Sequence, residues 1–127
     1  MNAIVLEAGA LIALERDDRT LWAALKLSAL KRTGVVVPST VVAQVWRAAP
    51  SQARLALALH HCVIAPFDPV ARAACELCGR AKTDDICDAH VALVACNRGD
   101  VLYTSDPLDL RHLLAVHGGR KPKFVRC

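Results

Sequence analysis

Acidic residues in this chain stand where a divalent metal could be bound. Glu7 directly follows the apolar run at residues 3–6, and Asp106 comes shortly after a second apolar run at residues 101–103. Short continuous apolar runs predict strands that are buried on both faces of a parallel sheet. Because ligands of open parallel sheets bind beyond the carboxyl ends of the strands, we expect the two acids to meet there.

More acids lie near the predicted starts of two helices. Asp84, Asp85 and Asp88 cluster before and within the first turn of one helix, and Asp109 lies one turn into the last helix. Helix capping and the helix dipole offer another explanation for such acids, and it fits Asp84, Asp85 and Asp109 best. It fits Glu7 less well, because a carboxylate that ends a buried strand needs a partner or a metal.

Clustered carboxylates predict chemistry on a phosphodiester. Mg²⁺ binds one or two carboxylates, keeps several waters and completes its shell with substrate phosphate. A metal held in this way polarises a phosphate and lowers the pKa of a bound water. Such a metal could therefore activate a water and steady a leaving oxygen.

The elements that would position these acids alternate between strands and helices. Strands are predicted at residues 3–6, 35–37, 62–65, 101–103 and, as an edge strand, 123–126. Helices are predicted at residues 8–14, 20–32, 39–46, 50–60, 68–79, 86–96 and 107–116. Asp17 or Asp18, Ser39 or Thr40, and Asp68 are the expected N-caps. This order predicts a three-layer α/β/α fold around a central, mostly parallel sheet of four or five strands.

Composition limits the class of protein. The chain has 127 residues, 54% hydrophobic and 22% charged, so we expect residues 1–127 to form one domain with a true core. A net charge of +4 and a pI near 8.9 suit a phosphate-rich partner such as RNA, although scattered arginines can also simply be solvated. No apolar stretch is long enough to span a membrane, and Glu7 interrupts the first apolar run, so a cytoplasmic protein is expected.

Four segments together resemble the motifs of PIN-domain nucleases, the fold of the VapC toxins of bacterial toxin–antitoxin pairs. They occur in the expected order over nearly the whole chain: IVLEAGALIALER, VPSTVVAQVWR, ICDAHVALVA and LYTSDPLDL. The first is similar to the family's strand followed by an acid, and the second to a helix after the second strand. The third resembles an Asp that opens an Ala-rich helix, and the fourth a strand that ends in Thr-Ser-Asp.

The resemblance implies roles for particular residues. Glu7, Asp88 and Asp106 would bind Mg²⁺ or Mn²⁺, and Gln44 and Asp109 would position waters. Asp85 would be an accessory acid, and Thr104 and Ser105 match a hydroxyl pair that orients a neighbouring acid or water. Two positions depart from the family pattern: Glu7 stands where Asp is usual, and Gln44 stands where many members have Glu.

The implied function is that of a metal-dependent endoribonuclease, the toxin of a toxin–antitoxin pair, which cleaves structured RNA of the tRNA or rRNA class. Its implied partners are a small antitoxin, whose C-terminal segment fills a groove, and a second copy of the chain. The alternative is a catalytically weak or inactive PIN-fold binding protein. Glu7 is one methylene longer than Asp and Gln44 carries no charge, which would weaken a second metal most.

Cysteine and tryptophan offer rival interpretations. Cys75-x-x-Cys78 followed by Cys87-x-x-His90 has the spacing of a zinc site, and Cys75-x-x-Cys78 also that of a redox pair. Both pairs fall inside predicted helices without a tight turn, so buried thiols that pack as small hydrophobes are favoured.

Trp22 and Trp46 are expected in the core or at a partner interface, with stacking on RNA bases as the alternative.

Overall fold

A five-stranded sheet forms the centre of the molecule in the computed structural model, which describes residues 3–127. The strands are β1 (Ala3–Leu6), β2 (Gly34–Pro38), β3 (Val63–Ala65), β4 (Val101–Thr104) and β5 (Lys123–Arg126). Their order across the sheet is β3-β2-β1-β4-β5, and every neighbouring pair is parallel. The predicted strands, including β5 as an edge strand, are confirmed.

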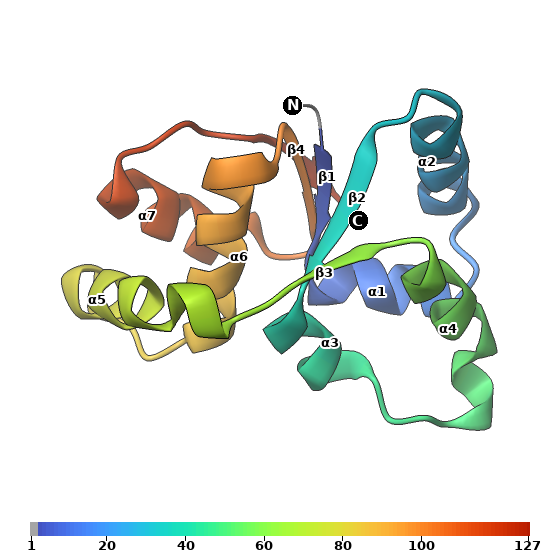
Figure 1. Cartoon of the computed structure of the whole chain (residues 1–127), viewed down its shortest axis with the longest axis horizontal. Coiled ribbons are helices and arrows are strands. Elements are labelled where there is room, and N and C mark those ends of the chain that lie inside the picture. Colours follow the sequence, from blue (N-terminus) through green and yellow to red (C-terminus); the bar gives the residue numbers. More distant parts are fainter. Residues whose placement is uncertain (1–2) are drawn as a thin grey trace.

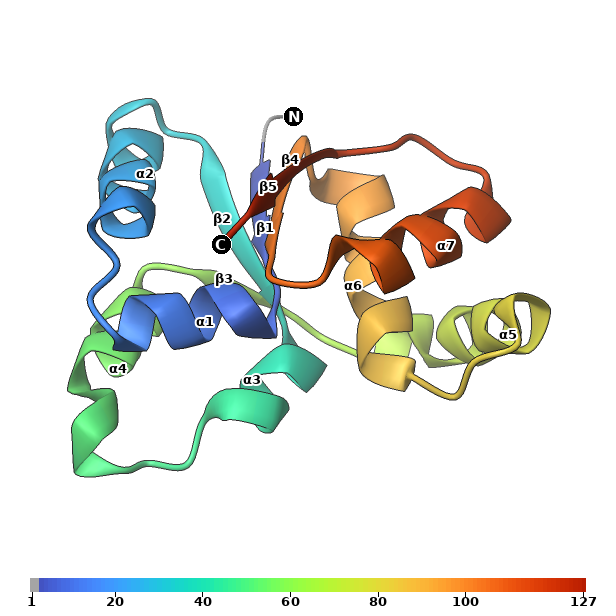
Figure 2. The same ribbon diagram turned by 180° about the vertical axis from the view of Figure 1, so that it is seen from behind.

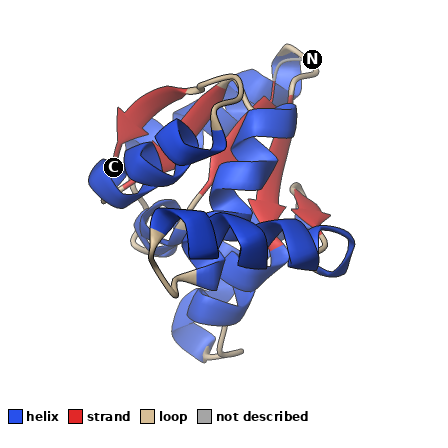
Figure 3. Cartoon of the chain, turned by 90° about the vertical axis from the view of Figure 1, so that its left-hand side faces the viewer, coloured by secondary structure: helices blue, strands red, loops and turns tan. Residues whose placement is uncertain are grey.

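Helices cover both faces of this sheet. They are α1 (Ala8–Glu15), α2 (Arg19–Leu30), α3 (Ser39–Val45), α4 (Ala53–His60), α5 (Ala71–Ala81), α6 (Ile86–Arg98) and α7 (Pro107–His117). Helices α5, α6 and α7 lie on one side, and α1, α2 and α4 on the other (Figures 1 and 2). Figure 3 shows the strands enclosed between helices. The predicted three-layer α/β/α fold is confirmed.

Two of the predicted helix starts are wrong in detail. Pro38 is the N-cap of α3 and gives no side-chain capping bond, so Ser39 and Thr40 lie inside the helix. Asp68 begins a short 3₁₀ turn, and α5 starts only at Ala71. In both places a proline sets the entry of the chain, because its fixed φ suits the start of a helical segment.

The prediction for the second helix holds. Asp18 caps α2, because its Oδ1 accepts the N–H of Leu21 at 3.0 Å. Asp17, the other expected cap, instead adopts a left-handed backbone conformation with φ 64°.

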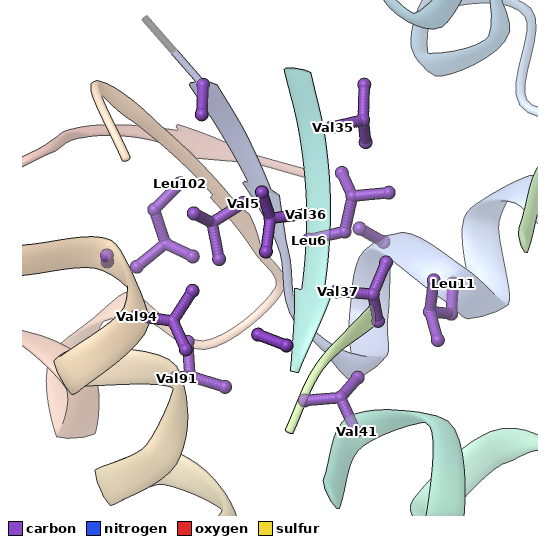
Figure 4. Close-up of a cluster of buried hydrophobic side chains, with 14 of the residues drawn as sticks. Val5, Leu6, Leu11, Val35, Val36, Val37, Val41, Val91, Val94 and Leu102 are labelled. Atoms are coloured by element: carbon purple, nitrogen blue, oxygen red, sulfur yellow. The ribbon is translucent and has the colours of Figure 1, made fainter. Parts of the chain in front are cut away.

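Two apolar clusters hold the layers together. The first surrounds β1 and β2, where Val91 and Val94 of α6 pack on one face of the sheet and Leu11 of α1 lies on the other (Figure 4). The second joins α5, α6 and α7 and includes Leu77 and Leu113. Coverage on both faces explains why the central strands are continuous apolar runs without alternation.

Trp22 and Trp46 are half-buried and pack against the first cluster, as expected for core residues. The indole N–H of Trp22 also donates to the Leu14 carbonyl at 3.1 Å. In the described part of the chain, no helix is both long and apolar enough to cross a membrane.

Candidate active site

The sheet brings the ends of β1 and β4 to the same edge. β1 and β4 are neighbours with Leu6 opposite Tyr103, and the N–H of Glu7 donates to the Tyr103 carbonyl at 3.1 Å. Glu7 and Asp106 therefore both follow strands that end side by side. In the view of Figure 1 the strands end at the bottom of the sheet, and α6 also begins at its lower end.

Thr104 connects the two acids directly. Its hydroxyl donates to Oε1 of Glu7 at 2.9 Å and accepts the backbone N–H of Asp106 at 3.0 Å. Thr104 is completely buried at the end of β4. The hydroxyl thus fixes the Glu7 carboxylate relative to the backbone that carries Asp106.

Glu7 also caps the first helix. Its Oε1 accepts the N–H of Gly9 at 3.2 Å, at the N-terminus of α1. From the sequence, helix capping fitted Glu7 less well than metal binding. The structure shows that Glu7 is nevertheless the N-cap of α1. Gly9 is needed here because a Cβ at this position would lie 2.6 Å from the Cβ of Ser105. The start of α1 is thereby packed tightly against the loop that follows β4.

Asp88 lies among other carboxylates. Asp85 is the N-cap of α6, and its Oδ1 accepts the N–H of Asp88 at 2.9 Å. Asp88 is half-buried, and burial together with the negative charges of Asp85, Glu7 and Asp109 raises its pKa to about 7. Acids from the end of β1, from α6 and from α7 therefore gather in one neighbourhood, although they are far apart in the sequence.

The remaining predicted site residues are placed differently. Asp106 is exposed, makes no side-chain capping bond at the start of α7, and is not among the charges that raise the pKa of Asp88. Its side chain lines a hollow that also contains Arg111 and Arg126. Gln44 is exposed on α3, a helix that packs against α6. The structure thus brings Glu7, Asp88 and Asp109 together. Asp106 is linked to Glu7 only through its backbone N–H, which donates to the Thr104 hydroxyl that also bonds to Glu7.

The donors present suit a hard cation. Carboxylate oxygens are the ligands that Mg²⁺ and Mn²⁺ prefer, and mutual repulsion among them, seen in the raised pKa of Asp88, is relieved by a bound cation. Within residues 3–127, however, no three His, Cys, Asp or Glu side chains converge in positions that would hold one ion.

A connection between α3 and α6 was not predicted from the sequence. Oγ1 of Thr40 and Nδ1 of His90 are 2.8 Å apart, and His90 is completely buried in α6. Nε2 of His90 has no hydrogen-bond partner among the described residues, and burial lowers the pKa of the ring. Since α3 carries Gln44 and α6 carries Asp88, this contact fixes two elements of the site. No local pattern reveals it, because the two residues are 50 positions apart.

Among residues 3–127, the cysteines do not gather into a group that could hold a zinc ion. The thiol of Cys78 donates to the carbonyl of Asp85, and the thiol of Cys87 lies against the carbonyl of Thr40. His90 turns its Nδ1 to Thr40. Cys75 is exposed on α5. These contacts favour the interpretation of the buried cysteines as packing residues.

Comparison with known proteins rests on the fold. No protein-family model matches the chain, and no curated protein sequence matches it. A chain in the crystal structure of VapBC2 from Rickettsia felis, bound to a DNA fragment from their promoter, is similar with a TM-score of 0.67. The similarity covers 98% of this chain and 98% of that chain at 15% sequence identity. The chain therefore has the α/β fold of the VapC PIN domain, with five parallel strands.

Proposed function

We propose that this protein is a metal-dependent endoribonuclease that acts as the toxin of a toxin–antitoxin pair. The observation that carries the proposal is the gathering of Glu7, Asp88 and Asp109 at the carboxyl edge of a sheet with the VapC fold. Glu7, Asp88 and Asp106 would bind Mg²⁺ or Mn²⁺. The proposed substrate is structured RNA of the tRNA or rRNA class.

The chain's own residues would prepare the site for the cation. Thr104 holds the Glu7 carboxylate, and Asp85 fixes the start of α6 through the N–H of Asp88. Burial and the neighbouring acids raise the pKa of Asp88 to about 7, so its carboxylate is only partly ionised near neutral pH and a bound cation would favour the ionised form. A bound Mg²⁺ or Mn²⁺ would polarise the scissile phosphate and lower the pKa of a bound water.

Cleavage of tRNA in the presence of Mn²⁺ tests this proposal. Asp88→Asn and Asp106→Asn should each lower the cleavage rate by roughly 100-fold or more while the protein stays folded. Glu76→Gln is the matched control, because Glu76 is an exposed acid on α5 and lines no part of the acidic neighbourhood. Cleavage that persists in both Asn variants, or in excess EDTA, would show that the reaction does not use these acids.

A catalytically weak or inactive binding protein is the second candidate. It is favoured by the contacts that already engage Glu7 and by the exposed, uncharged Gln44. Calorimetric titration with Mn²⁺ separates the two candidates, since a binding protein with impaired ligands should take up no metal at millimolar concentration. Heat of binding that disappears in Asp88→Asn would support the nuclease.

The proposed partners are a small antitoxin and a second copy of the chain. The similar structure from Rickettsia felis is a VapBC2 assembly bound to promoter DNA, which supports the search for such an antitoxin. Co-purification with the product of a short neighbouring reading frame tests the first partner. Light scattering of the purified chain tests the homodimer.

A further inference from the structure

A basic hollow borders the acidic neighbourhood on the side of α7 and β5. Its volume is about 440 Å³, and its lining includes Asp106, Arg111, Phe124 and Arg126. Arg126 ends β5 and lies opposite Thr104 in the parallel register, so it stands at the same carboxyl edge as Glu7. The hollow therefore lies at the same edge of the sheet as the acids.

The two arginines are available to a ligand. Among residues 3–127 the only ion pairs are those of Arg54 with Asp17 and of Arg120 with Asp100. Arg111 and Arg126 are exposed, and no side-chain hydrogen bond of either is found in the described part of the chain. Their guanidinium donors are thus not satisfied by the protein.

Phe124 holds one of the guanidinium groups in place. The Cζ of Arg111 lies 4.9 Å from the centroid of the Phe124 ring, a cation–π contact between α7 and β5. Such stacking fixes the guanidinium plane but leaves its N–H groups at the rim free to donate. Phe124 and Arg126 are two residues apart on one strand and so project from the same face of β5. Arg111 and Arg126 therefore belong to one preorganised surface.

We propose that Arg111 and Arg126 bind a backbone phosphate of the RNA strand next to the position of cleavage. Guanidinium groups match the two oxygens of a phosphate in bidentate geometry. The inference rests on the proposed function for the identity of the nucleic acid, and it assigns a substrate-binding role to residues that no motif marks. Asp106, on the rim of the same hollow, would separate this phosphate from the scissile one.

Binding can be measured apart from cleavage. A fluorescein-labelled RNA hairpin is titrated in EDTA with the parent protein, Arg111→Gln, Arg126→Gln and the double variant, and anisotropy reports the affinity. The double variant should bind about tenfold more weakly, and the slope of log K against log salt should fall by about one for each lost contact. Because no metal is present, failure of the protein to cleave RNA would leave this result unaffected.

Arg32→Gln is the matched control. Arg32 is exposed and lies in the turn between α2 and β2, at the opposite edge of the sheet, and its loss removes the same charge. If Arg111→Gln disturbs the packing on Phe124, the affinity and salt slope of Arg126→Gln alone decide the result. Affinity and salt slope that stay at the parent value, or that fall equally in Arg32→Gln, would overturn the proposal.

Discussion

Thr104 is the residue through which the two strand-end acids are connected. Its buried hydroxyl donates to Glu7 and accepts from the backbone of Asp106. Thr104→Val keeps the shape of the side chain but leaves both partners without this bond. An unmade hydrogen bond at a buried position costs about 1–3 kcal/mol, so the free energy of unfolding in urea should fall by that amount.

The same variant should also bind Mn²⁺ more weakly, because the Glu7 carboxylate would keep the bond from the Gly9 N–H but lose its link to the strand that leads to Asp106. Thr104→Ser is the control, since it retains the hydroxyl and should keep both stability and metal binding close to those of the parent. Equal stability of the Val and Ser variants would mean that the hydroxyl is not a structural link.

Asp88 makes stability depend on pH in a particular direction. Burial and the neighbouring acids raise its pKa to about 7, so the folded chain retains a proton that the unfolded chain has already released above its ordinary pKa. Stability of the metal-free protein should therefore fall as pH rises from about 4 to about 7 and level off above that. Thermal melting in EDTA across this range measures the effect.

Asp88→Asn provides the comparison. The Asn side chain does not ionise, so this variant should be more stable than the parent at about pH 8, by roughly 2 kcal/mol after allowance for partial solvent screening. Addition of Mn²⁺ at that pH should stabilise the parent and leave the variant unchanged. A parent that gains stability as pH rises through this window would contradict the expectation.

At the scale of elements, the contact between α3 and α6 links the helix that carries Gln44 to the helix that carries Asp88. Thr40 of α3 bonds to Nδ1 of His90, which is completely buried in α6. Thr40→Val would remove this bond from the buried ring, at a cost of about 1–3 kcal/mol in the free energy of unfolding. Thr40→Ser restores the hydroxyl and should recover the parent value in the same urea titration.

Loss of this contact should also alter the site without changing its ligands. If α3 shifts, the Mn²⁺ affinity measured by calorimetry should fall in Thr40→Val but not in Thr40→Ser. If Thr40→Val is less stable but binds Mn²⁺ as tightly as the parent, the bond between Thr40 and His90 contributes to folding and not to the site.

At the scale of the molecule, α6 joins two cores. Val91 and Val94 belong to the cluster around the sheet, whereas Leu93 belongs to the cluster with α5 and α7. A substitution that removes apolar contacts from the cluster of α5, α6 and α7 should therefore lower the stability of the whole chain. Leu77→Ala, in α5, removes a completely buried side chain and should cost about 2–5 kcal/mol.

Urea denaturation followed by tryptophan fluorescence measures this cost, since Trp22 lies in the other cluster. Leu108→Ala is the control, because Leu108 is 72% exposed and its loss should change little. A tryptophan transition that does not move in Leu77→Ala would mean that the two clusters unfold independently.

Sequence patterns were sufficient to predict the layers and the strands of this protein. Continuous apolar runs such as residues 3–6 indicate burial on both faces, and a run before an acid indicates where a strand ends. These are local signals, because hydrophobic periodicity and proline act on neighbouring residues. They also predicted that Glu7 and Asp106 would follow strands and that Asp88 would open a helix, which is why the candidate site could be listed before the fold was known.

Only the tertiary structure decided which side chains share a neighbourhood. Placing β1 beside β4 joins Glu7 to Thr104 across 97 positions, and the packing of α6 brings Asp88 near both Glu7 and Asp109. The structure also places Asp106 and Arg126 in the lining of one hollow. Strand order and the rotation of a helix on a sheet depend on the packing of the whole core, so no local pattern encodes them. The sequence thus determines which residues are acidic, and the fold determines which of them lie together.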